Sequence, residues 1–112
     1  MANMHHMKKF WIVEYGGDFT PISCEVHEDG SPVLADLRKH LPDVYFERID
    51  LHGGAGDWVG TLWVDEEAGI SGQPGNAMLT DLVRKFAGRI HVNGNMKGRA
   101  ILQCIEHFIV PA

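Results

Sequence analysis

The stretch Asp50–Asn76 constrains this chain most, because it holds seven of the 13 glycines in the sequence. A glycine-rich loop at its start leads into the apolar run Trp58–Asp65, and a second glycine-rich segment then ends at Asn76. Glycine accepts tight and left-handed backbone turns that other residues avoid. The stretch therefore predicts a loop, a strand and a second loop, which the rest of the chain must hold in place.

Six apolar runs have the length and composition of β-strands. They are Lys9–Tyr15, Phe19–Val26, Val44–Leu51, Trp58–Asp65, Arg89–Val92 and Arg99–Val110. The first run is apolar on both alternating faces, which predicts a strand covered on both sides. The second contains Pro21, which has no N–H for a ladder, so we expect this strand either to lie at a sheet edge or to begin after Pro21. Gly60, within the fourth run, indicates a bulge or a close approach of another backbone.

Two helices are predicted from capping signals. Ser31-Pro32 has the form of a cap followed by a first helical residue, and Pro42 stops the helix. Asn76 is expected to cap the second helix, whose apolar stripe lies within Met78–Phe86. Gly88 has the position of its C-terminal glycine.

The chain has 112 residues, 45% of them apolar, which is the size and composition of one globular domain. Residues 7–112 are expected to form a single α+β domain, a mostly antiparallel sheet of five or six strands with two helices packed on it. Residues 1–6 are expected to be a disordered leader or an expression remnant.

The net charge of −5 is unevenly distributed, with −8 over residues 1–75 and +3 over residues 76–112. The acidic part argues against nucleic-acid binding, which requires clustered cations. The basic part suits one anionic group, or it pairs with the acidic surface within the fold or across a dimer.

Cys24 and Cys104 lie in apolar runs, which indicates free thiols in a reducing cytoplasm, and a single disulfide between them is also compatible with the sequence. The apolar run Phe10–Val13 is too short for a signal sequence or a membrane span. A cytoplasmic protein without a membrane segment is therefore expected.

The segment Gly54–Gly60 invites comparison with nucleotide-binding glycine loops, but a strand follows it where a helix is required, and no Walker lysine is present. A hairpin loop is the simpler interpretation. No serine lies in a Gly-x-Ser-x-Gly elbow, and both cysteines sit in predicted strand cores. None of the internal histidines has metal-ligand spacing. We therefore predict no catalytic set, no metal and no cofactor.

Two loops supply the candidate site. Gly72–Asn76 opens a helix, where free amides suit a phosphate or carboxylate with help from Arg89, Lys97 or Arg99, although a plain loop and cap fit as well. Trp58 follows a glycine loop and is either an exposed anchor for a partner or folded over the core edge. The predicted site residues are His52, Gly53, Gly54, Gly56, Asp57, Trp58, Gln73, Asn76 and Arg99.

The segment Val64–Ala77 runs from an acidic turn into Ile-Ser-Gly-Gln-Pro-Gly-Asn at a helix start. It resembles a family of small uncharacterised proteins from phages and plasmids, in which this stretch reads Leu-x-Gly-Leu-Pro-x-Asn. The opening Met7–Glu14 is similar to their first strand, and the chain departs from the pattern at Asp65, Ile70 and Gln73. The resemblance implies a mobile-element accessory protein and assigns no residue roles.

The sequence thus predicts a non-enzymatic phage- or plasmid-type accessory protein that binds a host macromolecule, for example to inhibit a host defence system. The alternative is a small-ligand binder that captures an anionic nucleotide or metabolite. The helix start at Asn76 would hold the anion, Arg89 or Arg99 would add positive charge, and Trp58 would stack on the base. A homodimer that pairs through the edge of Ile101–Val110 is a further expectation.

Overall fold

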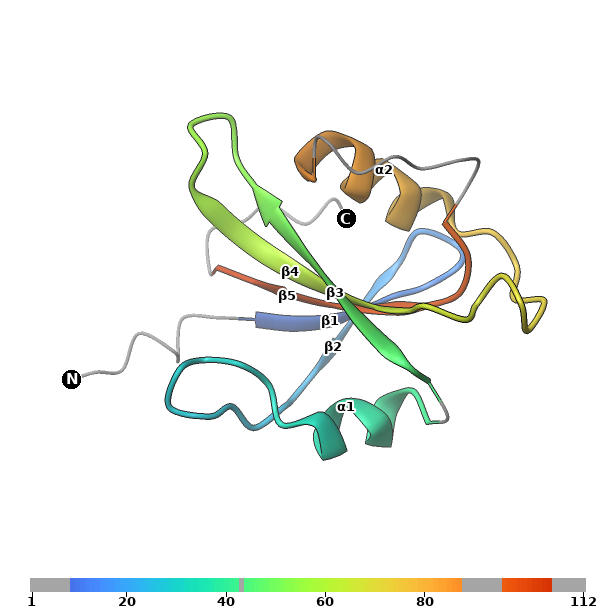
Figure 1. Cartoon of the computed structure of the whole chain (residues 1–112), viewed down its shortest axis with the longest axis horizontal. Helices are drawn as coiled ribbons and strands as arrows, with labels where there is room; N and C mark the ends of the chain where they lie inside the picture. The colour runs from blue at the N-terminus through green and yellow to red at the C-terminus, as the bar shows by residue number, and fades with distance from the viewer. Residues whose placement is uncertain (1–8, 43, 88–95, 106–112) are drawn as a thin grey trace.

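The computed structural model describes residues 9–42, 44–87 and 96–105. Its elements in chain order are β1 (Lys9–Val13), β2 (Phe19–Ile22), α1 (Leu34–His40), β3 (Phe46–His52), β4 (Trp58–Asp65), α2 (Ala77–Phe86) and β5 (Ala100–Cys104). The five strands form one antiparallel sheet in the order β2-β1-β5-β4-β3 (Figure 1). The predicted α+β class, with a mostly antiparallel sheet and two helices, is confirmed.

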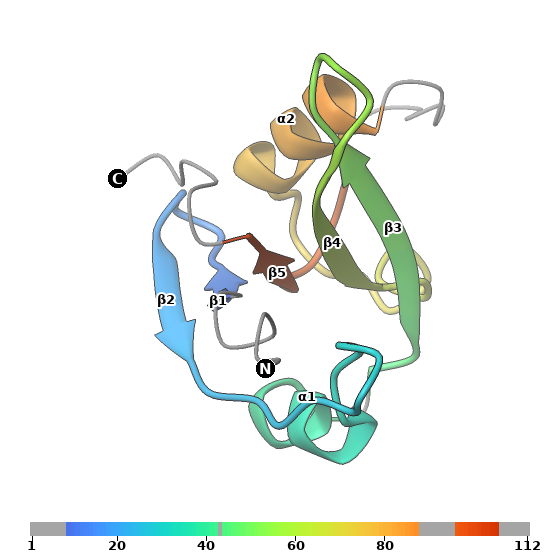
Figure 2. The same cartoon turned by 90° about the vertical axis from the view of Figure 1, so that its left-hand side faces the viewer.

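The two helices cover opposite faces of the sheet, as both views show (Figures 1 and 2). The α2 face buries Val13, Ile49, Leu51, Leu62, Val64, Leu79, Leu82, Val83, Ala100, Leu102 and Cys104. The α1 face buries Phe10, Ile12, Leu37, Leu41 and Ile101. Alternate residues of β1 therefore enter different cores, which confirms that this strand is covered on both sides.

Strand β5 lies in the middle of the sheet, between β1 and β4. Every residue of β5 is buried, because two strands and two cores surround it. The expectation that Ile101–Val110 offers an edge for dimer pairing is therefore wrong for its described part. The outer strands are β2 and β3, and the predicted edge position of the Pro21 strand is confirmed.

Several element boundaries differ from the predictions. Helix α1 begins at Leu34, with Val33 as a cap that makes no side-chain hydrogen bond. The predicted cap, Ser31, instead turns back to Asp29: its backbone amide and its hydroxyl both donate to Oδ1, at 2.9 and 2.6 Å. The Ser31 hydroxyl is thus used within its own turn and not as a cap, and the helix begins two residues later than predicted, at Leu34 instead of Pro32.

The first two strands end earlier than predicted, at Val13 and Ile22, and β3 runs from Phe46 to His52. The bounds of β4 and the cap at Asn76 are as predicted. Gly88, the run Arg89–Val92, residues 1–6 and the end of the last predicted strand lie outside the described residues.

Gly60 is required by the packing of β4 on β5. A Cβ atom there would lie 2.7 Å from the backbone oxygen of Gln103 and 3.2 Å from the Cβ of Cys104. Because that oxygen belongs to a central strand, it cannot move without disturbing the ladder. The predicted close backbone approach is confirmed.

We expect Gly60→Ala to lower the free energy of unfolding by about 1–3 kcal/mol, because the added methyl overpacks the ladder. Gly54→Ala is the matched control, since no heavy atom lies within 4 Å of the position its Cβ would take. Urea unfolding of both variants measures the difference. Equal midpoints for the two would contradict the packing argument.

Candidate functional site

The two loops predicted to form one surface lie at opposite ends of the sheet. Strand β4 begins at Trp58, beside the Gly53–Asp57 loop, and ends at Asp65, beside the loop that leads to Asn76 (Figure 1). Seven strand steps separate these ends by about 23 Å. The expectation of a joint surface is therefore wrong, because the eight residues of β4 are extended between the loops.

The Gly53–Asp57 segment is a tight hairpin loop. The amide of Gly53 donates to the Asp57 carbonyl at 2.8 Å, and the amide of Gly56 donates to the Gly53 carbonyl at 2.9 Å. Gly56 has a φ of +89°, which a side chain would strain. His52, Gly54, Gly56 and Asp57 are exposed. The hairpin interpretation of these glycines is confirmed.

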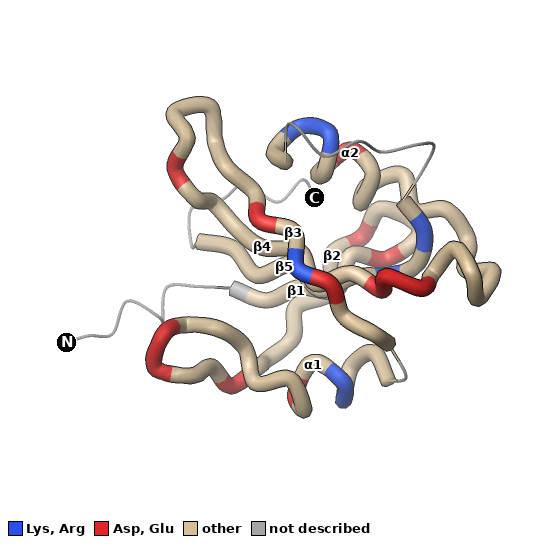
Figure 3. Tube along the Cα trace, viewed as in Figure 1, with Lys and Arg blue, Asp and Glu red and all other residues tan. Residues whose placement is uncertain are grey.

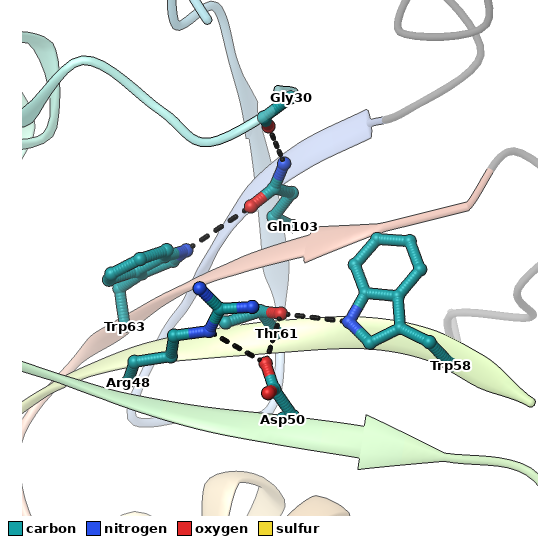
Figure 4. A network of polar contacts seen from close by, with 7 residues as sticks. All are labelled: Gly30, Arg48, Asp50, Trp58, Thr61, Trp63 and Gln103. Atoms are coloured by element: carbon teal, nitrogen blue, oxygen red, sulfur yellow. Dashed lines mark hydrogen bonds and ion pairs between the residues drawn. The ribbon is translucent and has the colours of Figure 1, made fainter. Parts of the chain in front are cut away.

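Trp58 belongs to a polar cluster on the α1 face (Figure 4). Its indole Nε1 donates to the Thr61 hydroxyl at 2.9 Å, and that hydroxyl donates to Asp50 at 2.9 Å. Arg48 donates to the same carboxylate at 2.9 Å and lies over the Trp63 ring.

The half-buried Trp58 ring is therefore fixed to the sheet and folds over the core edge, so it is not a freely exposed anchor. A second chain of contacts completes the cluster around a cavity of about 250 Å³. Trp63 Nε1 donates to Gln103 Oε1 at 3.3 Å, and Gln103 Nε2 donates to the Gly30 carbonyl at 2.7 Å. Both indole N–H groups thus have acceptors within the fold.

The cluster favours the ionised form of Asp50. Partial burial opposes ionisation, but the hydrogen bonds from Arg48 and Thr61 outweigh it, and the pKa of Asp50 lies below its ordinary value. A lowered pKa in the folded state means that ionised Asp50 stabilises the fold at neutral pH. This contribution is lost as the pH falls through the folded pKa.

Asn76 has a structural role. Its side chain is fully buried, and its Oδ1 accepts the amide of Leu79 at 3.0 Å, which caps α2. Its Nδ2 donates to the carbonyls of Val13 and Gly98, at 3.1 and 3.0 Å. The expectation that this side chain contacts a ligand or partner is therefore wrong, because the fold uses its oxygen and both of its N–H donors.

A larger cavity, of about 380 Å³, lies at the end of the sheet near Asp65. It is lined by Glu14, Tyr15, Leu41, Pro42, Val44, Asp65, Gln73, Gly98 and Arg99. Tyr15 donates its hydroxyl hydrogen to Gln73 Oε1 at 2.8 Å, and Arg99 lies 3.5 Å from Glu14. Two predicted site residues, Gln73 and Arg99, therefore meet here, away from Trp58 and its loop.

The surface around this cavity is acidic, and we call it the acidic end: residues 14–18, 44–45, 65–76 and 97–99. It carries five carboxylates and two cations, namely Glu14, Asp18, Asp65, Glu66, Glu67, Lys97 and Arg99. Figure 3 shows the acidic segments gathered there with basic positions between them. A ligand that carries positive charge is therefore favoured over an anion.

Three of the four exposed large hydrophobic side chains of the described residues also lie at the acidic end. Tyr15 is 38% exposed, Tyr45 is 60% exposed and Ile70 is 86% exposed. The Tyr45 carbonyl accepts the amide of Glu66 at 3.0 Å, which joins the start of β3 to the acidic turn.

None of these three residues is among the predicted site residues, because Tyr15 and Tyr45 lie in runs with the pattern of β-strands. Ile70 was visible as an apolar residue in a polar turn. An apolar residue in a polar turn is expected to be exposed, but the sequence does not show which other segments of the fold lie beside it.

Among the described residues, no group of three or more His, Cys, Asp or Glu side chains is placed to hold a metal ion. Neither α1 nor α2, the helices in this part of the chain, has the length and apolar character needed to cross a membrane. A scan against protein-family models, a search of curated proteins and a search of solved structures found no match to this chain.

The variant Thr61→Val tests the Trp58 cluster. It removes the Thr61 hydroxyl that accepts the Trp58 indole N–H, so we expect a loss of about 1–2 kcal/mol in the free energy of unfolding at pH 7. It also removes a donor to Asp50, so the pKa of that carboxyl should rise. The difference in free energy of unfolding between the variant and the wild type should therefore shrink as the pH falls below about 4, because Asp50 is then protonated in both proteins.

Thermal unfolding against pH and NMR titration of the Asp50 carboxyl measure both effects. Thr20→Val is the matched control, because the Thr20 hydroxyl donates to Glu14 at an exposed position of β2. An unchanged Asp50 titration in Thr61→Val would contradict the described hydrogen bond.

Proposed function

We propose that this chain is a non-enzymatic binding module and that the acidic end is the surface that meets its partner. The observation that carries the proposal is that exposed Tyr15, Tyr45 and Ile70 lie at the same end of the sheet as a cavity of about 380 Å³, which Tyr15 lines. Exposed apolar side chains beside a concave site are typical of protein-binding surfaces. The further proposal of a phage- or plasmid-type accessory protein with a host partner rests on the sequence resemblance.

The composition of the acidic end supports a protein partner. Tyrosine and arginine are enriched where binding energy concentrates in interfaces, and both occur here. Burying the Ile70 side chain, which is 86% exposed, would contribute about 2 kcal/mol to binding. Its position in a turn away from the strands lets it enter a pocket on another molecule.

The charge of the cavity supports a partner with a basic side chain. Glu14 and Asp65 line the cavity with a single cation, Arg99, which is already close to Glu14. A lysine or arginine of the partner could lie between the two carboxylates while its aliphatic part contacts Leu41 and Val44. The same charges disfavour nucleic acid, whose phosphates seek cations.

A small anionic ligand is the competing proposal. Its favourable features are Arg99 and Gln73, which line the same cavity. Against it stand the two carboxylates of the cavity, the buried side chain of Asn76 and the distance of Trp58 from this end. We therefore favour a protein partner.

We place this binding in the cytoplasm. Cys24 and Cys104 are both free thiols, which suits a reducing compartment. Burial, with a smaller contribution from the nearby Asp36 carboxylate, raises the pKa of Cys24 to about 11. The thiol is therefore protonated and unreactive at neutral pH.

The test is affinity capture from a bacterial extract, followed by calorimetric titration of the purified partner. Ile70→Ala should weaken binding by about 2 kcal/mol, roughly 30-fold in Kd, because it removes an apolar anchor. Leu34→Ala is the matched control, since Leu34 is 44% exposed but lies on α1. It should bind like the wild type.

Equal losses in both variants, or none in either, would contradict the assignment of the acidic end. A thermal shift with nucleotides that Arg99→Ala removes would favour the small-ligand proposal instead.

A further inference from the structure

The outer edge of β3 is the longer of the two sheet edges. Strand β3 has seven residues and no proline, whereas β2 at the other edge has four residues and contains Pro21. In the part of the chain that the structure describes, no strand lies on the outer side of β3. Its outward backbone groups are therefore available for pairing with another strand.

The register with β4 defines which backbone groups point outward. The amide of Glu66 donates to the Tyr45 carbonyl at 3.0 Å, so these two residues form a hydrogen-bonded pair of the ladder. Hydrogen-bonded pairs alternate along an antiparallel ladder, so Glu47, Ile49 and Leu51 also bond to β4. The N–H and C=O groups of Phe46, Arg48 and Asp50 point away from the sheet.

The side chains on this edge carry opposite charges two residues apart. Arg48 and Asp50 share the α1 face, their side chains are 55% and 39% exposed, and they lie 2.9 Å from each other. Ile49 lies between them on the opposite face, within the α2 core. A second strand that pairs with this edge would therefore lie beside a cation, Arg48, and an anion, Asp50, on the same face of the sheet.

We propose that β3 pairs antiparallel with β3 of a second copy of this chain, with Ile49 of each copy opposite Ile49 of the other. In this register Arg48 faces Asp50 of the second copy, and Asp50 faces its Arg48. Each of these pairs joins residues whose backbone groups point outward, so each can form a hydrogen-bonded pair. Two opposite-charge contacts and a continuous ladder then form together.

The charges also disfavour the neighbouring registers. Symmetric arrangements centred on Arg48 or on Asp50 would also pair outward-pointing residues, but the first places two arginines opposite each other and the second places two aspartates opposite each other. Like charges directly opposite across a ladder are destabilising, whereas opposite charges are stabilising. Of the registers centred on Arg48, Ile49 or Asp50, the one centred on Ile49 pairs opposite charges.

Pairing of the two β3 strands places a segment of the second copy beside the acidic end. Because the strands are antiparallel, the Tyr45 end of one β3 lies beside the hairpin loop at Gly53 of the other copy. The glycine loop and the acidic end, which are far apart within one chain, thus become adjacent across the dimer. The dimer would present this combined surface twice.

Sedimentation velocity on the full chain tests the proposal. We expect the wild type to show a reversible monomer–dimer equilibrium between about 10 and 500 μM, since a single strand pair makes a small interface. Arg48→Asp alone and Asp50→Arg alone should each associate at least about tenfold more weakly, because each places like charges opposite one another twice.

An equimolar mixture of the two variants should restore the dimer. The Arg48→Asp chain has aspartate at both positions 48 and 50, and the Asp50→Arg chain has arginine at both. In the mixed dimer each aspartate therefore faces an arginine. A dimer in the mixture also shows that both variants are folded. Lys39→Asp is the matched control, because it reverses an exposed charge that pairs with Asp36 on α1, and it should associate like the wild type.

A wild type that stays monomeric over this range would overturn the proposal. Single variants that associate like the wild type would also overturn it, as would a mixture that stays monomeric while both variants have native circular dichroism.

Discussion

The buried side chain of Asn76 joins the end of β1, the approach to β5 and the start of α2, the segments that position the acidic end. Its amide nitrogen bonds the end of β1 and the approach to β5, and its oxygen caps the first turn of α2. Its own backbone amide donates to the Met96 carbonyl at 2.8 Å. Since a buried amide without partners costs about 1–3 kcal/mol, these contacts specify one arrangement of the three segments.

The acidic turn takes its position from this region. Gly98 has a φ of +85°, and a Cβ there would lie 3.1 Å from the Cβ of Ala68, which is itself buried. The turn is therefore packed on the segment that leads into β5, while Ile70 at its tip remains exposed. A rigid base with an exposed apolar tip loses little conformational entropy on binding, which is what a recognition loop requires.

The central position of β5 determines which strands form the edges of the sheet. Because β5 bonds to β1 and β4, the only outer strands among the described elements are β2 and β3. Strand β2 contains Pro21, which has no N–H to donate to a further strand. Of these two edges, the β3 edge is therefore the one suited to pairing with another strand. The acidic end provides side chains for recognition, and the β3 edge provides backbone groups and one ordered pair of charges.

The sequence by itself determined the α+β class, the strand β4, the cap at Asn76, the edge position of the Pro21 strand and the close approach at Gly60. These features follow from local rules: side-chain periodicity, the missing N–H of proline, the missing Cβ of glycine and the short reach of a capping side chain. The predicted start of α1 was wrong, because the Ser31 amide and hydroxyl bond to the Asp29 carboxylate and Ser31 does not cap the helix. Only the tertiary structure decided that Asn76 is buried, that Trp58 and Gln73 lie at opposite ends of β4, and that Tyr15, Gln73 and Arg99 line one cavity. The physical reason is that these relations depend on strand order and on contacts between segments distant in sequence, which no local pattern of residues encodes.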